Sequence, residues 1–336
     1  MNSTDSTLAP DFTLADVEQL LAKLARDIVA TPLLRCHAES ELHRAARDVS
    51  SVALKLELMQ IAGSFKIRGV LSNLAGQSSA QLARGVTAVS AGNHAIAVSF
   101  AARRVGISAK VVMPKSANPR RVEVCRSHGA DVILADDVHA AFGIMEAIAR
   151  DEGRYVVHPF EGRAVAMGTA TLGLELLRQA PNVDAIVVPI GGGGLCAGVA
   201  TVAKAMKPAC EVFGVEPFGA DSMYRSFAAG APQALEKVAT IADSLGAPFA
   251  LPYSFALCRA AVSEIVRVSD DELRAAMRLL FRDAKLAVEP AAAASTAAFC
   301  GPLASRLAGR NVALIVSGTN LDAATYWRHL DAPSGA

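Results

Sequence analysis

The sequence predicts an α/β protein with parallel sheets, and three observations point to this class. Short apolar runs alternate with longer segments of helical periodicity between residues 52 and 316. Hydrophobic residues make up 52% of the 336 residues and aromatic residues only 5%, which suits aliphatic helices packed on a buried sheet. A chain of this length is also long enough for two lobes.

The predicted elements follow one another in βαβ order. The first is a helix after Thr13, whose hydroxyl can cap it, because apolar residues from 17 to 24 recur with helical spacing. The apolar runs predicted to form strands are 52–58, 86–89, 110–113, 130–134, 185–190, 212–215, 265–268 and 312–316. Amphipathic segments such as 95–105 and 119–128 lie between them. This alternation predicts parallel strands joined by right-handed crossovers.

The charge balance and the cysteines argue against several classes of protein. Lys and Arg total 33 against 32 Asp and Glu, a net charge of +1, so we expect no nucleic-acid partner. No apolar run is long enough to span a membrane, and the first 13 residues lack the regions of a signal peptide. The six cysteines form no Cys-x-x-Cys pair, which favours reduced thiols. We therefore expect a cytoplasmic protein without a membrane partner.

Two glycine-containing loops are suited to one cofactor. Lys66 follows Gly63 and Ser64 on a predicted strand-to-helix turn, where burial would lower its pKa and favour imine formation. Gly191–Gly194 and Leu195 join a predicted strand to a helix, so that several N–H groups and the helix dipole converge on an anion site. An isolated lysine is more often exposed, and a glycine turn alone is a weak signal. An amine paired with an anion cradle indicates pyridoxal phosphate.

A third loop and one strand end carry further polar groups. In the run Ser90-Ala91-Gly92-Asn93-His94, the Asn93 amide can donate to the phenolate oxygen of the cofactor, while Ser90 and the loop N–H groups can bind a substrate carboxylate. The same residues can simply cap a helix, and His94 can be structural. Ser317 ends a predicted strand, where its hydroxyl can face the pyridine nitrogen or only belong to a turn.

These motifs resemble those of the serine/threonine dehydratases of fold type II. The resemblance runs from about Thr31 to about Asp322. It rests on Lys55-x-Glu57-x-x-Gln60-x-x-Gly63-Ser64-Phe65-Lys66-x-Arg68-Gly69, on the Ser90–His94 loop, on the four glycines and on Ser317-Gly318-x-Asn320. It implies a tryptophan synthase β-like fold, in which two parallel-sheet lobes hold pyridoxal phosphate between them, and a homodimer or homotetramer. It also implies that Lys66 forms the Schiff base, with Phe65, Asn93, Gly191–Leu195, Glu289 and Ser317 binding the cofactor.

The resemblance also implies a division into domains. We expect a flexible tail over 1–12, a large cofactor-binding domain over 13–78 and 158–330, and a small inserted domain over 79–157. β-Replacement enzymes such as cysteine synthases share the fold but carry a different lysine loop.

Several positions depart from the pattern of the family. Glu216 and Ala220 match two ligands of a divalent-cation site in some relatives, but Ser222 stands where a second carboxylate is expected, so the cation stays open. Glu289 can equally belong to a structural ion pair. The departures expected to make the pocket more apolar, if they line it, are Ala166, Met167, Ala292 and Thr319.

The predicted activity is that of a pyridoxal-phosphate-dependent ammonia-lyase. It converts a 3-hydroxy-L-amino acid, threonine or serine first, to a 2-oxo acid and ammonia, with Lys66 as the base that removes the Cα proton. The alternatives are a phenylserine or 3-hydroxyaspartate dehydratase, a serine racemase-like enzyme and a non-catalytic protein that holds the cofactor. Racemases of this family place a serine where Ala91 stands, so dehydration is expected to dominate.

Overall fold

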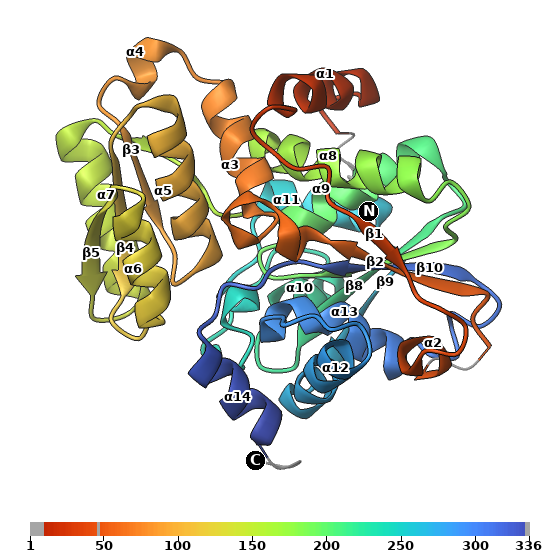
Figure 1. The fold of residues 1–336 in the computed structure, drawn as a ribbon. Coiled ribbons are helices and arrows are strands. Elements are labelled where there is room, and N and C mark those ends of the chain that lie inside the picture. The colour runs from red at the N-terminus through yellow and green to blue at the C-terminus, as the bar shows by residue number, and fades with distance from the viewer. Residues whose placement is uncertain (1–9, 46–47, 333–336) are drawn as a thin grey trace.

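The computed structural model describes residues 10–45 and 48–332 and contains two sheets. The six-stranded sheet has the order β1-β2-β10-β7-β8-β9, and the four-stranded sheet has the order β5-β4-β3-β6. In Figure 1 the smaller sheet lies at the left, with α4 to α7 around it, and the larger sheet lies at the right. The described strands pair in parallel except β1, which is antiparallel to β2.

The predicted strands are all present, with bounds that differ by at most two residues. The strands are β1 (Leu33–Arg35), β2 (Ser51–Leu56), β3 (Val86–Val89), β4 (Ala109–Pro114), β5 (Asp131–Ala135), β6 (Tyr155–Val156), β7 (Ala185–Pro189), β8 (Glu211–Pro217), β9 (Glu264–Val268) and β10 (Asn311–Val316). The strand predicted over 52–58 ends at Leu56, because Glu57–Met59 form a 3-10 turn. The two strands that the sequence did not predict, β1 and β6, are only three and two residues long.

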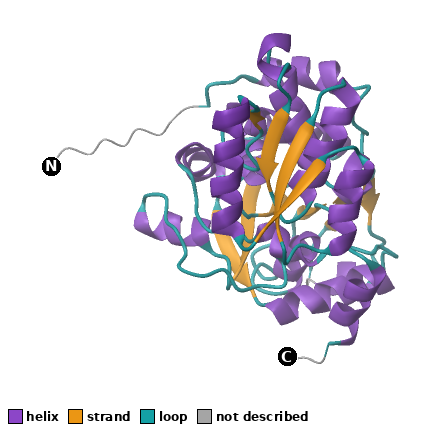
Figure 2. Cartoon of the chain, turned by 90° about the vertical axis from the view of Figure 1, so that its left-hand side faces the viewer, coloured by secondary structure: helices purple, strands orange, loops and turns teal. Residues whose placement is uncertain are grey.

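Helices lie on both sides of the strands (Figure 2). They are α1 (Leu14–Leu24), α2 (Glu41–Ala45), α3 (Lys66–Ala75), α4 (Ser79–Leu82), α5 (Asn93–Val105), α6 (Pro119–Ser127), α7 (Val138–Glu152), α8 (Arg163–Gln179), α9 (Gly194–Met206), α10 (Ser222–Ala229), α11 (Pro252–Ala261), α12 (Asp270–Arg282), α13 (Pro290–Cys300) and α14 (Ala323–Asp331). No helix in the described part of the chain is both long and apolar enough to cross a membrane.

The side-chain alternation of the strands explains the layers. In β7, Ala185 and Val187 join the apolar cluster of α12 and α13, whereas Ile186 and Val188 join that of α8 and α9. A strand that is apolar on both faces must be covered on both, which is why the central strands read as continuous hydrophobic runs. The larger sheet is therefore the middle of three layers.

The N-terminal region is tied to the body of the protein. Thr13 caps α1, and its hydroxyl and main-chain N–H pair with Asp16 in a capping box, as the sequence predicted for the cap. Phe12 is 5% exposed and belongs to the core beside α8 and α9. Phe12 is thus anchored in the core, whereas the first nine residues of the tail predicted over 1–12 lie outside the described part of the chain, and the tail stays a prediction.

The smaller sheet falls within the segment 79–157 that was predicted to form an inserted domain. Its core, however, includes Leu24 of α1 and Ile67, Val70 and Leu74 of α3, which precede that segment. The boundary between the lobes is thus crossed by a shared apolar cluster, and the division into domains stays a prediction. Since Lys66 begins α3, packing of this helix against the smaller lobe fixes where the lysine stands.

Candidate active site

The residues predicted to bind cofactor and substrate line a single cavity of about 650 Å³. They are Phe65, Lys66, Ser90, Ala91, Gly92, Asn93, His94, Gly191, Gly192, Gly193, Gly194, Leu195, Glu289 and Ser317. They follow the carboxyl ends of β3, β7 and β10 or begin the helices next to them, the usual location of ligands in parallel sheets. The volume lies within the range of about 300–1,000 Å³ typical of small-molecule sites.

Lys66 stands at the first position of α3, directly after a tight turn. The turn places Gly63 at φ +69°, and a Cβ there would come within 2.5 Å of Asn320 Oδ1, so only glycine fits. Lys66 Nζ donates a hydrogen bond of 2.6 Å to the Pro159 carbonyl. Burial lowers the pKa of Lys66 to about 8, against the opposing influence of the Glu289 charge. An amine with this pKa is partly unprotonated near neutral pH and available as a nucleophile.

The glycine loop leads from β7 into the N-terminus of α9. Gly193 adopts φ +92°, and no side chain in the described part of the chain caps the helix, so the first N–H groups of α9 are open to a ligand. A Cβ on Gly192 would lie 2.2 Å from the Phe160 ring, and one on Gly194 would lie 2.4 Å from the Phe160 carbonyl oxygen. The backbone can lie this close to Phe160 only because these residues lack side chains. Open N–H groups at a helix N-terminus suit a phosphate group.

Asn93 begins α5 and lies in a chain of side-chain amides and carboxylates. Its Nδ2 donates to Glu289 Oε1 at 2.6 Å, and its Oδ1 accepts from Asn320 Nδ2 at 2.8 Å. Asn93 Nδ2 also lies 3.3 Å from Ser244 Oγ. The predicted donation to the cofactor's phenolate, which stays a prediction, would use the hydrogen that faces Ser244.

Arg121, which the sequence reading missed, brings a positive charge to the same chain of polar groups. Its Nε donates to the Asn320 carbonyl at 2.6 Å, and its Nη2 lies 3.5 Å from Glu289 Oε2. Asp243 pairs with the same guanidinium. The close approach to the Ser90–His94 loop requires Gly92, where a Cβ would lie 2.8 Å from Arg121 Nη1. Arg121 and Asp243 are 122 residues apart, so no local motif could reveal the contact.

Glu289 is buried at the edge of this cavity. Its Oε2 accepts no hydrogen bond among the described residues, although Arg121 is near. Burial raises the pKa of Glu289 to about 7, more than the nearby Arg121 charge lowers it. A buried carboxyl oxygen without a hydrogen-bond donor is costly, which makes Glu289 a candidate contact for a bound group.

The two histidines near Lys66 are held neutral. Burial lowers the pKa of His94 to about 3, and its Nε2 lies 2.8 Å from the Val157 carbonyl. Burial lowers the pKa of His158 to about 4, and its Nδ1 accepts from the main-chain N–H of Glu161 at 3.0 Å. The Nε2 of His94 is thus engaged with the main chain, and its predicted place in the substrate site stays a prediction.

Ser317 follows β10, and its main-chain carbonyl accepts the Phe65 N–H at 3.1 Å. This bond ties the lysine loop to the end of the larger sheet. Ser317 is 3% exposed and lines the cavity, so it lies where a ring nitrogen could meet it. Its predicted role stays a prediction.

The predicted cation ligands lie away from the cavity. Glu216 lies near the end of β8. Its carboxylate accepts hydrogen bonds from the main-chain N–H groups of Met223 at 3.0 Å and Tyr224 at 2.6 Å, which caps α10. Burial raises the pKa of Glu216 to about 8. Ala220 is buried in the turn before this helix. Within the described ranges no three His, Cys, Asp or Glu residues group as metal ligands, so the geometry does not support the cation.

The four family departures do not form the cavity wall among the described residues. Ala166 and Ala292 are buried in the helical core, and Met167 packs against the same apolar clusters. The Thr319 hydroxyl donates to the Ala287 carbonyl at 2.6 Å. The pocket was expected to become more apolar only if these positions line it, and that condition is not met, because their side chains lie in helix packing or in a turn.

The lysine, the glycine loop and their common cavity define the class of pyridoxal-phosphate-dependent enzymes. Residues 24–318 match the family of the pyridoxal-phosphate dependent enzymes, and the chain belongs to this family. Pyridoxal phosphate is therefore its cofactor, and the predicted family and fold class are confirmed.

The chain is similar over nearly its whole length to proteins of known name. The chain is 50% identical over 330 residues to phenylserine dehydratase of Ralstonia pickettii, covering 98% of this chain and 99% of that protein. It is 35% identical over 324 residues to catabolic L-threonine dehydratase of Staphylococcus aureus, covering 96% and 92%. It superimposes on maize serine racemase with a TM-score of 0.88 and 32% identity, covering 94% and 95%.

Proposed function

We propose that this chain is a dehydratase that converts a 3-hydroxy-L-amino acid to a 2-oxo acid and ammonia, with phenylserine as its preferred substrate. The observation that carries the proposal is Lys66, whose lowered pKa leaves a reactive amine in the cavity that the glycine loop also lines. Similarity to a phenylserine dehydratase over the whole chain supports the aryl substrate. We therefore rank phenylserine above threonine and serine, which the sequence alone had put first.

The residues present fit the cofactor. The open N–H groups at the start of α9 would hold its phosphate, Lys66 its aldehyde, and Asn93 and Ser317 the edges of its ring. When bound, pyridoxal phosphate draws electrons from the amino-acid Cα and so acidifies the Cα proton. A neutral hydroxyl at Ser317, where some enzymes have a carboxylate, leaves this electron withdrawal moderate, which suits elimination of a β-hydroxyl.

Lys66 is the group that moves the proton. Once free of the cofactor aldehyde, its neutral Nζ accepts the Cα proton, which its lowered pKa permits near neutral pH. Loss of the Cα proton and of the β-hydroxyl amounts in sum to one water, and one water re-enters when the released enamine hydrolyses. The net products are one 2-oxo acid and one ammonia for each amino acid.

Ala91 favours elimination over racemisation. Racemisation needs a proton donor on the face of Cα opposite Lys66, and Ala91 on the loop that lines the cavity carries none. His94 and His158 are neutral and engaged with the main chain, so they do not supply this proton.

The test is a substrate screen on the purified holoenzyme. Formation of 2-oxo acid is measured with serine, threonine, phenylserine and 3-hydroxyaspartate, and the D-amino acid is measured in parallel. We expect the highest kcat/KM for phenylserine. A clear preference for 3-hydroxyaspartate, or formation of D-amino acid as the main product, would refute the proposal.

The assembly and the location predicted from the resemblance belong to the same proposal. A homodimer or homotetramer is tested by light scattering on the holoenzyme, where a monomer at micromolar concentration would contradict it. Cytoplasmic location is tested by cell fractionation.

A further inference from the structure

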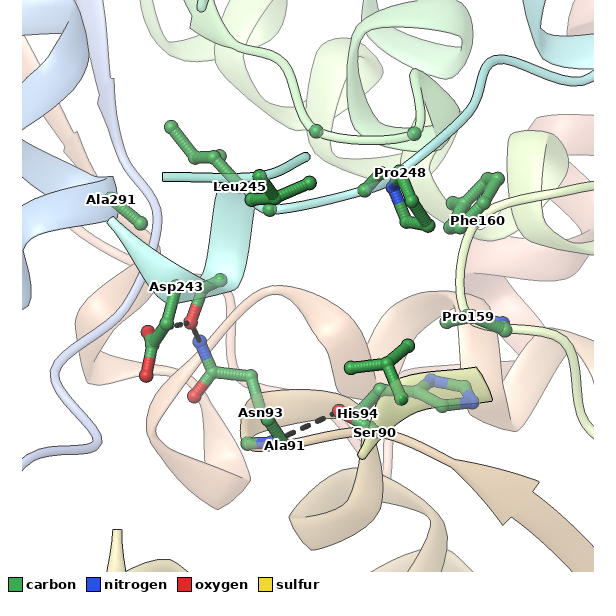
Figure 3. A pocket seen from close by; sticks show the side chains of 18 of the residues that line it. Ser90, Ala91, Asn93, His94, Pro159, Phe160, Asp243, Leu245, Pro248 and Ala291 are labelled. Carbon is green, nitrogen blue, oxygen red and sulfur yellow. Dashed lines mark hydrogen bonds between the residues drawn. The ribbon is translucent and has the colours of Figure 1, made fainter. Parts of the chain in front are cut away.

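The cavity has an apolar wall that no predicted cofactor contact explains. Leu245, Pro248 and Phe160 lie across the cavity from Ser90, Ala91 and Asn93 (Figure 3). The Ser90–His94 loop is polar and suited to an amino-acid carboxylate. The opposite wall offers carbon surface, which suits an apolar substituent and disfavours a charged one.

Two phenylalanine rings, Phe142 and Phe160, belong to the cavity lining, and a third, Phe249, packs against both. The ring centroids of Phe142 and Phe249 are 6.1 Å apart with their planes at 49°, and those of Phe249 and Phe160 are 6.2 Å apart at 57°. Phe142 comes from α7 beside the smaller sheet, whereas Phe249 lies in the loop before α11. The three rings therefore connect elements of both sheets, and Phe142 and Phe160 face the cavity.

The rings leave room for another aromatic group. Phe142 and Phe249 are only partly buried, and their centroid distances and tilts are those of favourable aromatic pairs. A phenyl ring that entered the cavity would find edges and faces already arranged for contact. It would also remove the exposed part of the Phe142 side chain from water.

We propose that Phe142 determines substrate specificity, by forming with Phe160 the subsite for the aryl group of a 3-aryl-3-hydroxy amino acid, while Phe249 packs against both rings from behind. The inference deepens the proposed function and rests on it. It assigns the preference to these rings at the junction of the lobes, and not to the departures at 166, 167, 292 and 319.

Phe142 separates specificity from cofactor binding better than Phe160 does. The Phe160 ring lies on Gly192 and its carbonyl on Gly194, so a change there disturbs the phosphate loop. Phe142 packs on the apolar cluster of Ala141, Met145 and Ile148 and reaches the cavity from the other lobe. Its replacement removes aromatic surface without altering the lysine or glycine loops.

The experiment compares Phe142→Ala, the milder Phe142→Leu and the control Phe281→Leu in the holoenzyme. Phe281 lies on α12 in another aromatic group, with Tyr326 and Trp327. The measured quantity is the ratio of kcat/KM for phenylserine to that for threonine. We expect this ratio to fall by on the order of 30-fold in Phe142→Ala and less in Phe142→Leu, and to stay unchanged in Phe281→Leu.

A binding measurement gives a second readout. L-Phenylalanine has the ring but no β-hydroxyl, so calorimetry on the holoenzyme reports the subsite without turnover. We expect Phe142→Ala to weaken L-phenylalanine by about tenfold or more relative to L-alanine. An unchanged substrate ratio or unchanged relative affinity in both variants would overturn the inference. If wild type forms no 2-oxo acid, the proposed function fails, and the calorimetry still decides the subsite.

Discussion

Two buried polar clusters differ in how completely their charges are paired. The first, the ionic cluster, consists of Lys55, Glu57, Arg68 and Glu175. Arg68 donates to both oxygens of Glu57 at 2.8 Å and to Glu175 at 3.0 Å. Lys55 pairs with Glu175 and donates to the Thr31 carbonyl at 2.7 Å. None of these four residues is more than 8% exposed, and each charge has an opposite partner.

The second, the pocket cluster, consists of Asn93, Arg121, Asp243, Glu289 and Asn320. It lies at the cavity, draws its members from both lobes and contains the Glu289 oxygen that accepts no hydrogen bond among the described residues. Burial raises the pKa of this same Glu289 carboxyl to about 7.

This difference suggests that the ionic cluster stabilises the fold, whereas the pocket cluster takes part in ligand binding. A complete buried cluster resists change, since removing one member leaves a charge without compensation. An incomplete cluster beside a cavity retains capacity for a ligand and can adjust the protonation of its neighbours. The sequence motif around Lys66 contributes to both clusters. Lys55, Glu57 and Arg68 form the ionic cluster, while Lys66 faces the pocket cluster.

The largest effect is expected at Lys66. Lys66→Ala should lower dehydration by at least about 10³-fold, because it removes the residue proposed both to attach the cofactor and to act as the base. The fold should persist, with a melting temperature close to that of wild type, since the ionic cluster is untouched. Lys115→Ala, an exposed lysine, is the matched control.

Chemical labelling sharpens this result. Borohydride reduction and peptide mapping of wild type should place the pyridoxyl group on Lys66. A label on another lysine would sink the assignment.

Disrupting the ionic cluster should lower the free energy of unfolding. Glu57→Gln leaves Arg68 buried with one partner fewer, and we expect the free energy of unfolding to fall by about 3–5 kcal/mol. Urea unfolding measures the loss. Glu123→Gln, which breaks an exposed pair with Arg120, should change unfolding little. Equal effects from the two substitutions would erase the distinction between the clusters.

The influence of the pocket cluster on Lys66 should be measurable in the pH dependence of cofactor binding. Only neutral Lys66 attacks the aldehyde, so the rate of pyridoxal phosphate binding to apoprotein should rise with pH and level off above about 8. The Glu289 charge raises the pKa of Lys66, so Glu289→Gln should move the midpoint below that of wild type. Stopped-flow absorbance of the cofactor measures both.

Glu236→Gln is the control for this shift, because Glu236 also lines the cavity but is exposed to solvent. Its midpoint should match wild type. A Glu289→Gln midpoint at or above the wild-type value would contradict the coupling.

Sequence reasoning succeeded where a pattern was local. The strands were found because apolar runs end at glycines and polar turns, and the lysine and glycine loops each occupy consecutive residues. It missed β1 and β6, which are too short to show periodicity. It also missed Arg121 and Phe142, whose roles depend on contacts with residues more than 100 positions away.

Specificity shows the same limit. The departures at 166, 167, 292 and 319 are visible in the sequence, yet the structure places them in packing or in a turn. A change in a motif identifies a position that differs, but only the fold decides whether its side chain reaches the ligand.

The smallest effect is expected at Ala91. This residue lies on the Ser90–His94 loop, which also carries Asn93 of the pocket cluster. Ala91 is partly exposed in the cavity, and the neighbouring Ser90 hydroxyl already accepts the Gly92 N–H at 3.0 Å. Ala91→Ser adds a hydroxyl that can donate a proton to the face opposite Lys66. We expect D-serine to form from L-serine at roughly a tenth of the rate of pyruvate or less, because a donor alone does not slow loss of the β-hydroxyl.

Chiral chromatography in D₂O measures this effect, since racemised serine acquires deuterium at Cα. Ala91→Gly, which changes the same position without adding a donor, should form no D-serine. If wild type already formed D-serine as fast as pyruvate, another group would have to supply the proton. The cavity would then hold a donor on that face besides position 91, and elimination would not follow from the alanine.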